Sequence, residues 1–330
     1  MIKNRITRRM FSRAALAATA LAVPPLHLAR AQQGYPNRPI RFILAFGAGG
    51  VADITARIAA DKLGEKLGQR IVVENQAGPG GIAAARTVTS APPDGHTLGL
   101  LTNGTAISVG AYNVLPFDPV KDFAPISALG TFGLVFAANS QSQFKTLGDV
   151  IKAAREAPGK LNVGTINVGG TQNLAAELFK STVGLNFQII PYRGTPEVII
   201  GLLRNDVHMM VEFYAPLKGA LSDNQLHAVA TTGLTRASYL ANVPTVAETV
   251  PGYDVTAWNG VVARVGTPPE ILSLLNRTMR EVLAIPEVKS KYVERGVEAE
   301  ASTPDELLAR LKSDITKWAA VIEKAGIPKQ

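Results

Sequence analysis

The chain has 330 residues, no cysteine and a formal net charge of +8 at pH 7. The lack of cysteine excludes disulfides, a thiol nucleophile and a cysteine-based metal site, and the length suffices for two domains. Without the first 31 residues, which hold six basic side chains and no acidic one, 28 basic residues face 26 acidic ones. The near-neutral remainder does not favour a nucleic-acid partner.

Residues 1–31 have the features of an export signal. A basic head precedes an apolar core at 14–23, which is too short and too alanine-rich for a membrane anchor, and the small-residue pattern at 29–31 fits a cleavage site. Arg8 and Arg9, followed by Phe11, look like a twin-arginine signal, although an ordinary secretory signal with two arginines stays open. Either route predicts export with cleavage near Ala31.

The clearest local pattern after this segment is a strand, a glycine loop and a helix. An apolar run at 40–46 reads as a buried strand, three glycines follow within residues 47–50, and residues 53–67 carry apolar positions at helical spacing. The first amides of such a helix lack internal partners and carry the positive end of its dipole, so they can hold an anion. Many α/β proteins use glycines here only to turn the chain, and both interpretations stay open.

The next segments repeat this order. Residues 70–74 form a predicted strand, 75–81 a second glycine loop, 82–90 a helix, and 97–101 a third strand that ends at Thr102. The predicted βαβαβ unit presents three strand ends on one edge. The crevice at the carboxyl ends of strands is where open α/β sheets bind ligands.

The pattern recurs in the middle of the chain. A strand at 160–165, a loop at 166–171 and a helix at 172–183 are followed by a strand at 187–191 and a helix at 196–204, with Thr171 and Thr195 as expected N-caps. Strands are expected at 207–213 and 227–231. Later helices are expected at 268–284, 286–295 and 304–325, the first and third opened by capping boxes at Thr267 and Thr303.

Two apolar segments divide the chain into lobes. Residues 131–138 and 255–263 are expected to cross between an N-terminal lobe, which includes the C-terminal helices, and a middle lobe. The predicted boundaries are 34–134 plus 258–330 for lobe 1 and 135–257 for lobe 2. Two crossings imply a hinge, and each lobe would aim a glycine loop at the cleft between them.

Short motifs in order over nearly the whole chain after the export segment carry a family resemblance. They are residues 35–40, Phe46–Gly50 with Asp53 and Ala56-Arg57, and residues 67–75, 93–98, 158–161, 177–180, 191–194, 243–245 and 266–268. Together they resemble the tripartite tricarboxylate transporter substrate-binding proteins, also called the Bug family. The resemblance implies an α/β, two-lobed periplasmic-binding-protein (Venus flytrap) fold. It also implies a periplasmic receptor without catalytic activity, which binds a small carboxylate and in some members delivers it to a membrane permease. We further expect a monomer without cofactor or metal.

The resemblance also implies a binding site. Two loops of lobe 1, at 46–50 and 78–82, would hold the ligand carboxylate, and a loop of lobe 2 would contact the far end. Our hypothesis is that the amides of 48–50 and 80–82 bind one carboxylate, with Thr165, Thr171 and Asn173 opposite. The full candidate set is Phe46, Ala48, Gly49, Gly50, Gly80, Gly81, Ile82, Thr102, Thr165, Gly170, Thr171, Asn173 and Glu212.

This sequence departs from the family pattern at several of these positions. Ala45 stands where proline is common, Pro79 where alanine is usual, Asn167 where glycine is usual, and Asn173 where histidine is usual; residues 205–208 replace a common Gly-x-Val-Asp. A clamp made of backbone amides in lobe 1 should survive such changes. Specificity, which lobe 2 sets, is what they put in doubt. A monocarboxylate, a dicarboxylate, an amino acid and an aromatic acid all stay open, as does a sensing role without a permease.

Three further residues have open roles. Glu212, near a strand end of lobe 2, could receive a ligand amine or hydroxyl or face solvent, and solvent is preferred. Trp258 could line the cleft or pack at the hinge. For Arg193 a structural ion pair is preferred over a ligand contact.

An exported dinucleotide-dependent oxidoreductase is the main alternative. Gly47, Gly49 and Ala52 fit G-x-G-x-x-A after a strand, and Glu74 ends the next strand where such folds keep a ribose-binding acid. A second glycine loop directly after Glu74 would crowd the ribose, and no acid–base pair or metal spacing of histidines is evident. A pure protein-interaction module would leave the two converging glycine loops unexplained.

Overall fold

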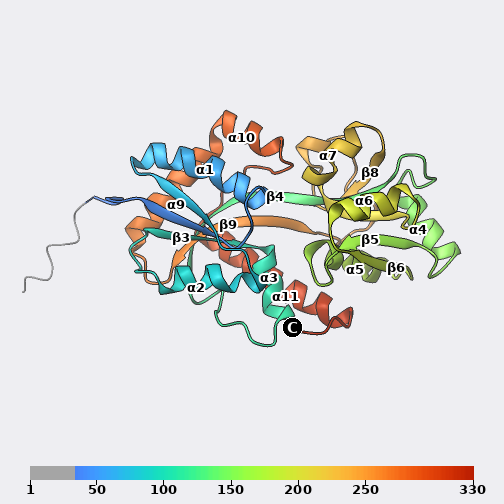
Figure 1. Cartoon of the computed structure of the whole chain (residues 1–330), viewed down its shortest axis with the longest axis horizontal. Coiled ribbons are helices and arrows are strands. Elements are labelled where there is room, and N and C mark those ends of the chain that lie inside the picture. Colours follow the sequence, from blue (N-terminus) through green and yellow to red (C-terminus); the bar gives the residue numbers. More distant parts are fainter. Residues whose placement is uncertain (1–33) are drawn as a thin grey trace, which may run out of the picture. The chain divides into compact units, whose positions relative to one another are not determined.

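The computed structural model describes residues 34–330, so the predicted export signal at 1–31 lies outside the described residues. Residues 38–330 form one unit, and its strands fall into two groups (Figure 1). In the first group, which we call the first lobe, β1 (Ile40–Leu44) pairs in parallel with β2 (Ile71–Asn75) and β3 (Thr97–Thr102). The predicted βαβαβ unit is therefore confirmed, and three strands end on one edge.

The second lobe is built in the same way. In it, β5 (Asn162–Ile166) pairs in parallel with β6 (Gln188–Tyr192) and β7 (Met209–Phe213). The helices of this lobe are α4 (Leu147–Glu156), α5 (Thr171–Val183), α6 (Thr195–Leu203), α7 (Tyr214–Ser222) and α8 (Val246–Thr249). Its strand ends again share one edge, and α5, α6 and α7 each begin close to such an end.

Two antiparallel strands join the lobes. The first part of β4 (Phe123–Asn139) pairs with β9 (Thr256–Arg264), and its second part pairs with β7 and with β8 (Leu226–Thr231). The sheet order is β2-β1-β3-β9-β4-β7-β5-β6, with β8 on β4 (Figure 1). The chain thus passes between the lobes along β4 and returns along β9, in agreement with the expected crossings.

Helices cover the sheet of the first lobe. These are α1 (Val51–Leu67), α2 (Ile82–Ser90), α3 (Asn103–Ala111), α9 (Pro269–Ala284), α10 (Pro286–Val293) and α11 (Pro304–Lys324). Helix α9 packs against α1 and α10, whereas α11 packs against α3 and β4. Within residues 34–330, no helix has the length and apolar character needed to cross a bilayer.

Several helix starts differ from expectation. Thr303 caps α11 with a capping box, as predicted, but Pro268 precedes α9 and the Thr267 hydroxyl donates to the Arg264 carbonyl instead. The N-caps of α5 and α6 are Gly170 and Gly194, so Thr171 and Thr195 are the first helical residues rather than caps. Both threonine hydroxyls are thereby free for other partners, which matters for the site.

Trp258 belongs to the core rather than to a cleft. It is fully buried, and its Nε1 donates to Oδ2 of Asp314 in α11 at 2.7 Å. Lys317 pairs with the same carboxylate at 2.9 Å, which compensates a charge that would be costly to bury alone. Of the two roles left open for Trp258, the structure supports packing, from within the crossing strand β9.

Candidate functional site

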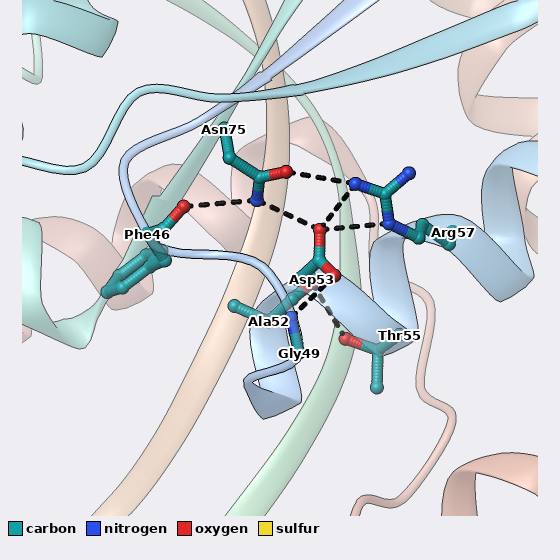
Figure 2. A network of polar contacts seen from close by, with 7 residues as sticks. All are labelled: Phe46, Gly49, Ala52, Asp53, Thr55, Arg57 and Asn75. Atoms are coloured by element: carbon teal, nitrogen blue, oxygen red, sulfur yellow. Dashed lines mark hydrogen bonds and ion pairs between the residues drawn. The ribbon is translucent and has the colours of Figure 1, made fainter.

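The first glycine loop is organised by Asp53, the third residue of α1. Asp53 is buried, and its Oδ2 accepts a hydrogen bond from the backbone amide of Gly49 at 2.9 Å (Figure 2). Gly49 has φ +85°, a conformation that favours glycine. We expected the Gly49 amide to be an open donor for a ligand. That expectation is wrong for this amide, because Asp53 occupies it.

The same carboxylate ties the loop to the next strand. Asn75, at the end of β2, donates through Nδ2 to Asp53 Oδ1 at 2.9 Å and to the Phe46 carbonyl at 3.0 Å, while Arg57 pairs with Asp53 at 2.9 Å (Figure 2). Burial alone would raise the pKa of Asp53, but the hydrogen bonds from Arg57, Gly49 and Asn75 outweigh burial and hold this pKa below its usual value. The loop is therefore fixed before any ligand arrives.

The second glycine loop closes on itself. The Gly81 amide donates to the Gly78 carbonyl at 3.2 Å, and the Ile82 amide donates to the Pro79 carbonyl. The expectation that the amides of Gly81 and Ile82 are free is thus wrong. The amides of Ala48, Gly50 and Gly80 have no hydrogen-bond partner among residues 34–330, so these three of the six expected donors stay available.

The third strand end of the first lobe is a helix start. Thr102 caps α3: its Oγ1 accepts from the Gly104 amide at 3.0 Å, and its own amide donates to Thr105 Oγ1. The next residue, Asn103, donates through Nδ2 to Oγ1 of Thr171 at 2.8 Å. Thr171 begins α5 in the second lobe, so this bond joins the two lobes. Asn103 was not predicted, and its position directly after the third strand was the only available signal.

The glycine loop of the second lobe has the same geometry as the first. Gly169 has φ +76°, and its amide donates to Oδ1 of Asn173, the third residue of α5, at 3.0 Å. Gly170 precedes α5 with φ −75° and ψ 167°, and Gly50 precedes α1 with φ −77° and ψ 169°. Asn173 therefore occupies the position that Asp53 has in the first lobe, without its charge.

Two predicted residues of the second lobe, Thr165 and Asn173, are buried and bonded to each other. Thr165 is fully buried and Asn173 nearly so, and Asn173 Nδ2 donates to Thr165 Oγ1 at 3.5 Å. Both loops also expose an apolar side chain: Phe46 is 38% exposed and Val168 is 54% exposed. The structure thus separates buried residues that shape the loops from exposed ones that a ligand can reach.

A cavity of about 390 Å³ brings some of the predicted residues together. Gly80, Gly170 and Thr171 line it, with side chains of α3 and the C-terminal residues up to Gln330. The backbone of Gln330 pairs with Ala111, the last residue of α3, and with Asn113. The other predicted residues do not line this cavity; they are Phe46, Ala48, Gly49, Gly50, Gly81, Ile82, Thr102, Thr165, Asn173 and Glu212.

Glu212 does not face solvent, so the preferred expectation for it is wrong. It is 1% exposed, and Oε1 accepts from Gln172 Nε2 and from the Phe213 amide, both at 2.7 Å, while Oε2 accepts from the Thr195 hydroxyl. Arg193 is exposed and forms no ion pair within residues 34–330, so the preferred structural ion pair is not found there.

The residues of the dinucleotide interpretation have other partners. Arg41 binds Glu74 through two hydrogen bonds of 2.7 Å, and this contact with Arg41 lowers the pKa of Glu74.

The histidines of the second lobe contact the backbone. His208 accepts from the Asn162 amide, and His227 contacts the Lys145 carbonyl. Residues 34–330 contain no group of His, Asp or Glu side chains that could hold a metal ion.

Comparison with known proteins identifies the family. A family model described as "Tripartite tricarboxylate transporter family receptor" matches residues 55–327. A "UPF0065 protein in tcbD-tcbE intergenic region" of Pseudomonas sp. strain P51 is 32% identical over 319 residues, which cover 96% of this chain and 93% of that protein. Protein BugT of Bordetella pertussis is 30% identical over 295 residues, covering 88% and 90% of the two chains.

Solved structures agree with this result. R. palustris Rpa4515 with adipate has a TM-score of 0.76 and 30% identity, over 90% of this chain and all of that chain. MatC from Rhodopseudomonas palustris with bound malate has a TM-score of 0.71 and 28% identity, over 87% of this chain and all of that one. The periplasmic binding protein BugD has a TM-score of 0.72 and 27% identity, over 90% of this chain and all of that one. The chain therefore belongs to the tripartite tricarboxylate transporter family of receptors, which are periplasmic solute-binding proteins with two lobes.

Proposed function

We propose that this protein captures one small carboxylate-bearing solute between its lobes and hands it to a transporter of the tripartite tricarboxylate type. The observation that carries the proposal is the pair of loops of one geometry before α1 and α5, one in each lobe. Helix starts with open backbone donors favour anions, and each charge-assisted amide bond contributes about 1.5–3 kcal/mol. The relatives Rpa4515 and MatC were solved with adipate and malate.

The proposed ligand contacts use the backbone amides that have no protein partner and the apolar side chains that are exposed. The amides of Ala48, Gly50 and Gly80 receive the carboxylate, and Phe46 and Val168 cover the apolar part of the solute. Thr102, Thr165, Asn173 and the amides of Gly49, Gly81 and Ile82 shape these surfaces through the hydrogen bonds described above. Gly170 and Thr171 form the opposing rim.

The remaining organisation is part of the same proposal. Lobe 1 consists of 34–134 with 258–330, lobe 2 consists of 135–257, and β4 and β9 act as the hinge. Removal of an export signal near Ala31 yields a periplasmic monomer. This monomer uses no cofactor or metal and catalyses no reaction. Closure of the hinge on a bound solute is the signal that a permease subunit reads.

Release of the native ligand tests the proposal directly. The mature chain is purified without refolding, denatured, and the freed small molecules are identified by mass spectrometry; calorimetry then measures their affinity. We expect a carboxylate bound one to one, with compaction in small-angle scattering. A ligand without a carboxylate, or a stoichiometric complex with NAD(P) in equilibrium dialysis, would overturn the proposal.

A further inference from the structure

The second lobe uses its own helix starts to hold a buried carboxylate. Gln172, which donates to Glu212, is the second residue of α5; Thr195 is the first residue of α6; and Phe213, whose amide donates as well, directly precedes α7. The starts of helices carry the positive end of the macrodipole and favour anions. In this lobe Glu212 already occupies that favourable place at the ends of β5, β6 and β7.

Within residues 34–330, no cation pairs with the Glu212 carboxylate. The donors to Glu212 are an amide side chain, a hydroxyl and a backbone amide, and within residues 34–330 Glu212 forms no ion pair. In the first lobe the buried carboxylate, Asp53, is paired with Arg57 at 2.9 Å. The corresponding residue of the second lobe, Asn173, is neutral. The buried carboxylates of the two lobes therefore differ: Asp53 is paired with a cation, whereas Glu212 is held by uncharged donors alone.

Arg193 does not neutralise the charge of Glu212. It lies in the turn before α6, but it is exposed, and water and salt screen an exposed charge far more than a buried one. A negative charge that is 1% exposed acts through a medium of low dielectric constant, so its repulsion of another anion is felt over a longer distance.

We infer that this receptor selects against a second negative charge on its ligand, so that its solutes are monocarboxylates, including zwitterionic amino acids, rather than dicarboxylates. The inference rests on the proposed function, in which the first lobe holds the one carboxylate. The end of the ligand that the second lobe contacts is then neutral or carries an ammonium group. The adipate and malate of the relatives are thus not a model for the solute of this chain.

Pairs of ligands of equal shape test this on the unmodified mature protein. Calorimetry compares succinate with succinamate, glutarate with glutaramate, adipate with adipamate and terephthalate with its monoamide, so that each pair differs by one charge. We expect the monoanion of every pair that binds to have the lower Kd by about tenfold or more. A dianion that binds as tightly as its monoamide overturns the inference and leaves the proposed function standing. If no member of any pair binds while a solute without a carboxylate does, the proposed function itself fails.

Variants then assign the effect to Glu212. Glu212→Gln keeps an oxygen acceptor and removes the charge, and we expect it to bring the affinity ratio within a pair to about one. Glu197→Gln is the matched control, because Glu197 is an exposed carboxylate in the first turn of α6, the helix that begins at Thr195, and it should leave the ratio unchanged. Arg193→Gln should also leave the ratio unchanged. Loss of dianion binding in Arg193→Gln would show that a second carboxylate is recognised, and would overturn the inference. The comparison on the unmodified protein stands even if Glu212→Gln does not fold.

Discussion

Asn103 of α3 and Thr171 of α5 share a side-chain hydrogen bond of 2.8 Å that joins the two lobes. Each is the first residue of its helix, and each follows a strand end of its own lobe. The bond therefore lies where the lobes face one another. A neutral hydrogen bond contributes about 0.5–1.5 kcal/mol, enough to favour one arrangement of the lobes and too little to lock it.

Removing this bond should weaken ligand binding. Thr171→Val keeps the shape of the side chain and removes the acceptor, and Asn103→Ala removes the donor. The bond exists only while the lobes are this close, so its loss disfavours the arrangement in which both loops reach one ligand. We expect the Kd to rise about two- to tenfold in calorimetry for either variant.

A double-mutant cycle provides the control for this prediction. If the effect of each substitution comes from the shared bond, the double variant should bind about as well as either single one. Fully additive losses would contradict the interpretation, since they would mean that the two side chains act independently.

Substitutions at the glycines around α1 separate ligand approach from backbone strain. Gly50 has an ordinary φ of −77°, and a Cβ there would lie 4.0 Å from its nearest neighbour, the Gly47 carbonyl oxygen. We expect Gly50→Ala to fold normally and to bind the solute about tenfold more weakly, because the new methyl group stands where the ligand approaches the amide.

Gly68 gives the matched control. It ends α1 in the left-handed region with φ +67° and has open space around it. Gly68→Ala should therefore destabilise the fold by about 1 kcal/mol in chemical denaturation and leave the Kd unchanged. Weak binding by Gly68→Ala, or normal binding by Gly50→Ala, would contradict the proposed approach to the first loop.

The sequence predicted the loops well because their signals are local. A buried strand, glycines that allow φ values of +85° and +76°, and an amphipathic helix all lie within about 30 residues of one another. The short helix α3 was missed, since its residues Asn103 and Gly104 resemble a turn. Helices α4 and α7 were missed as well, although Thr146 and Asp149 form a capping box at the start of α4.

What the sequence could not show is which amides are already used. The Gly49 amide is occupied by Asp53, four residues away, but Asp53 is itself fixed in part by Asn75, which lies on β2. Glu212 was expected at the surface because carboxylates are seldom buried. Its donors Gln172 and Thr195 are 40 and 17 residues away, and only the parallel pairing of β5 with β6 and β7 brings them together.

Breaking the buried contact of Trp258 should cost stability and not binding. Asp314→Ala leaves the Trp258 Nε1 donor enclosed without its acceptor, and we expect a loss of about 1–3 kcal/mol in chemical denaturation. Asp305→Asn, at an exposed position in the first turn of α11, is the control and should change stability by less than about 0.5 kcal/mol. A large change in ligand Kd for Asp314→Ala with unchanged stability would instead place Trp258 in the site.

The pairing of Asp53 with Arg57 should make part of the stability depend on pH. The pKa of Asp53 is lowered in the folded protein, so the stabilisation is fully present above the unfolded value of about 3.9 and is lost as the pH falls through the folded value. Arg57→Met removes the cation and leaves a carboxylate that is only 4% exposed. We expect this variant to be less stable at pH 7 by about 1–3 kcal/mol, and the difference from the unmodified protein to shrink towards pH 3.

Denaturation curves at pH 7, 5 and 3 measure this difference in the free energy of unfolding. The contributions of the other carboxylates cancel in the comparison, because both proteins contain them. Lys66→Met is the control: Lys66 pairs with Glu281 at 2.8 Å, but both side chains are exposed, so the loss should stay below about 0.5 kcal/mol. A difference between the unmodified protein and Arg57→Met that does not change with pH would show that packing of the arginine, and not the charge of Asp53, accounts for the stability. The first loop would then be held by Asn75 and the Gly49 amide alone.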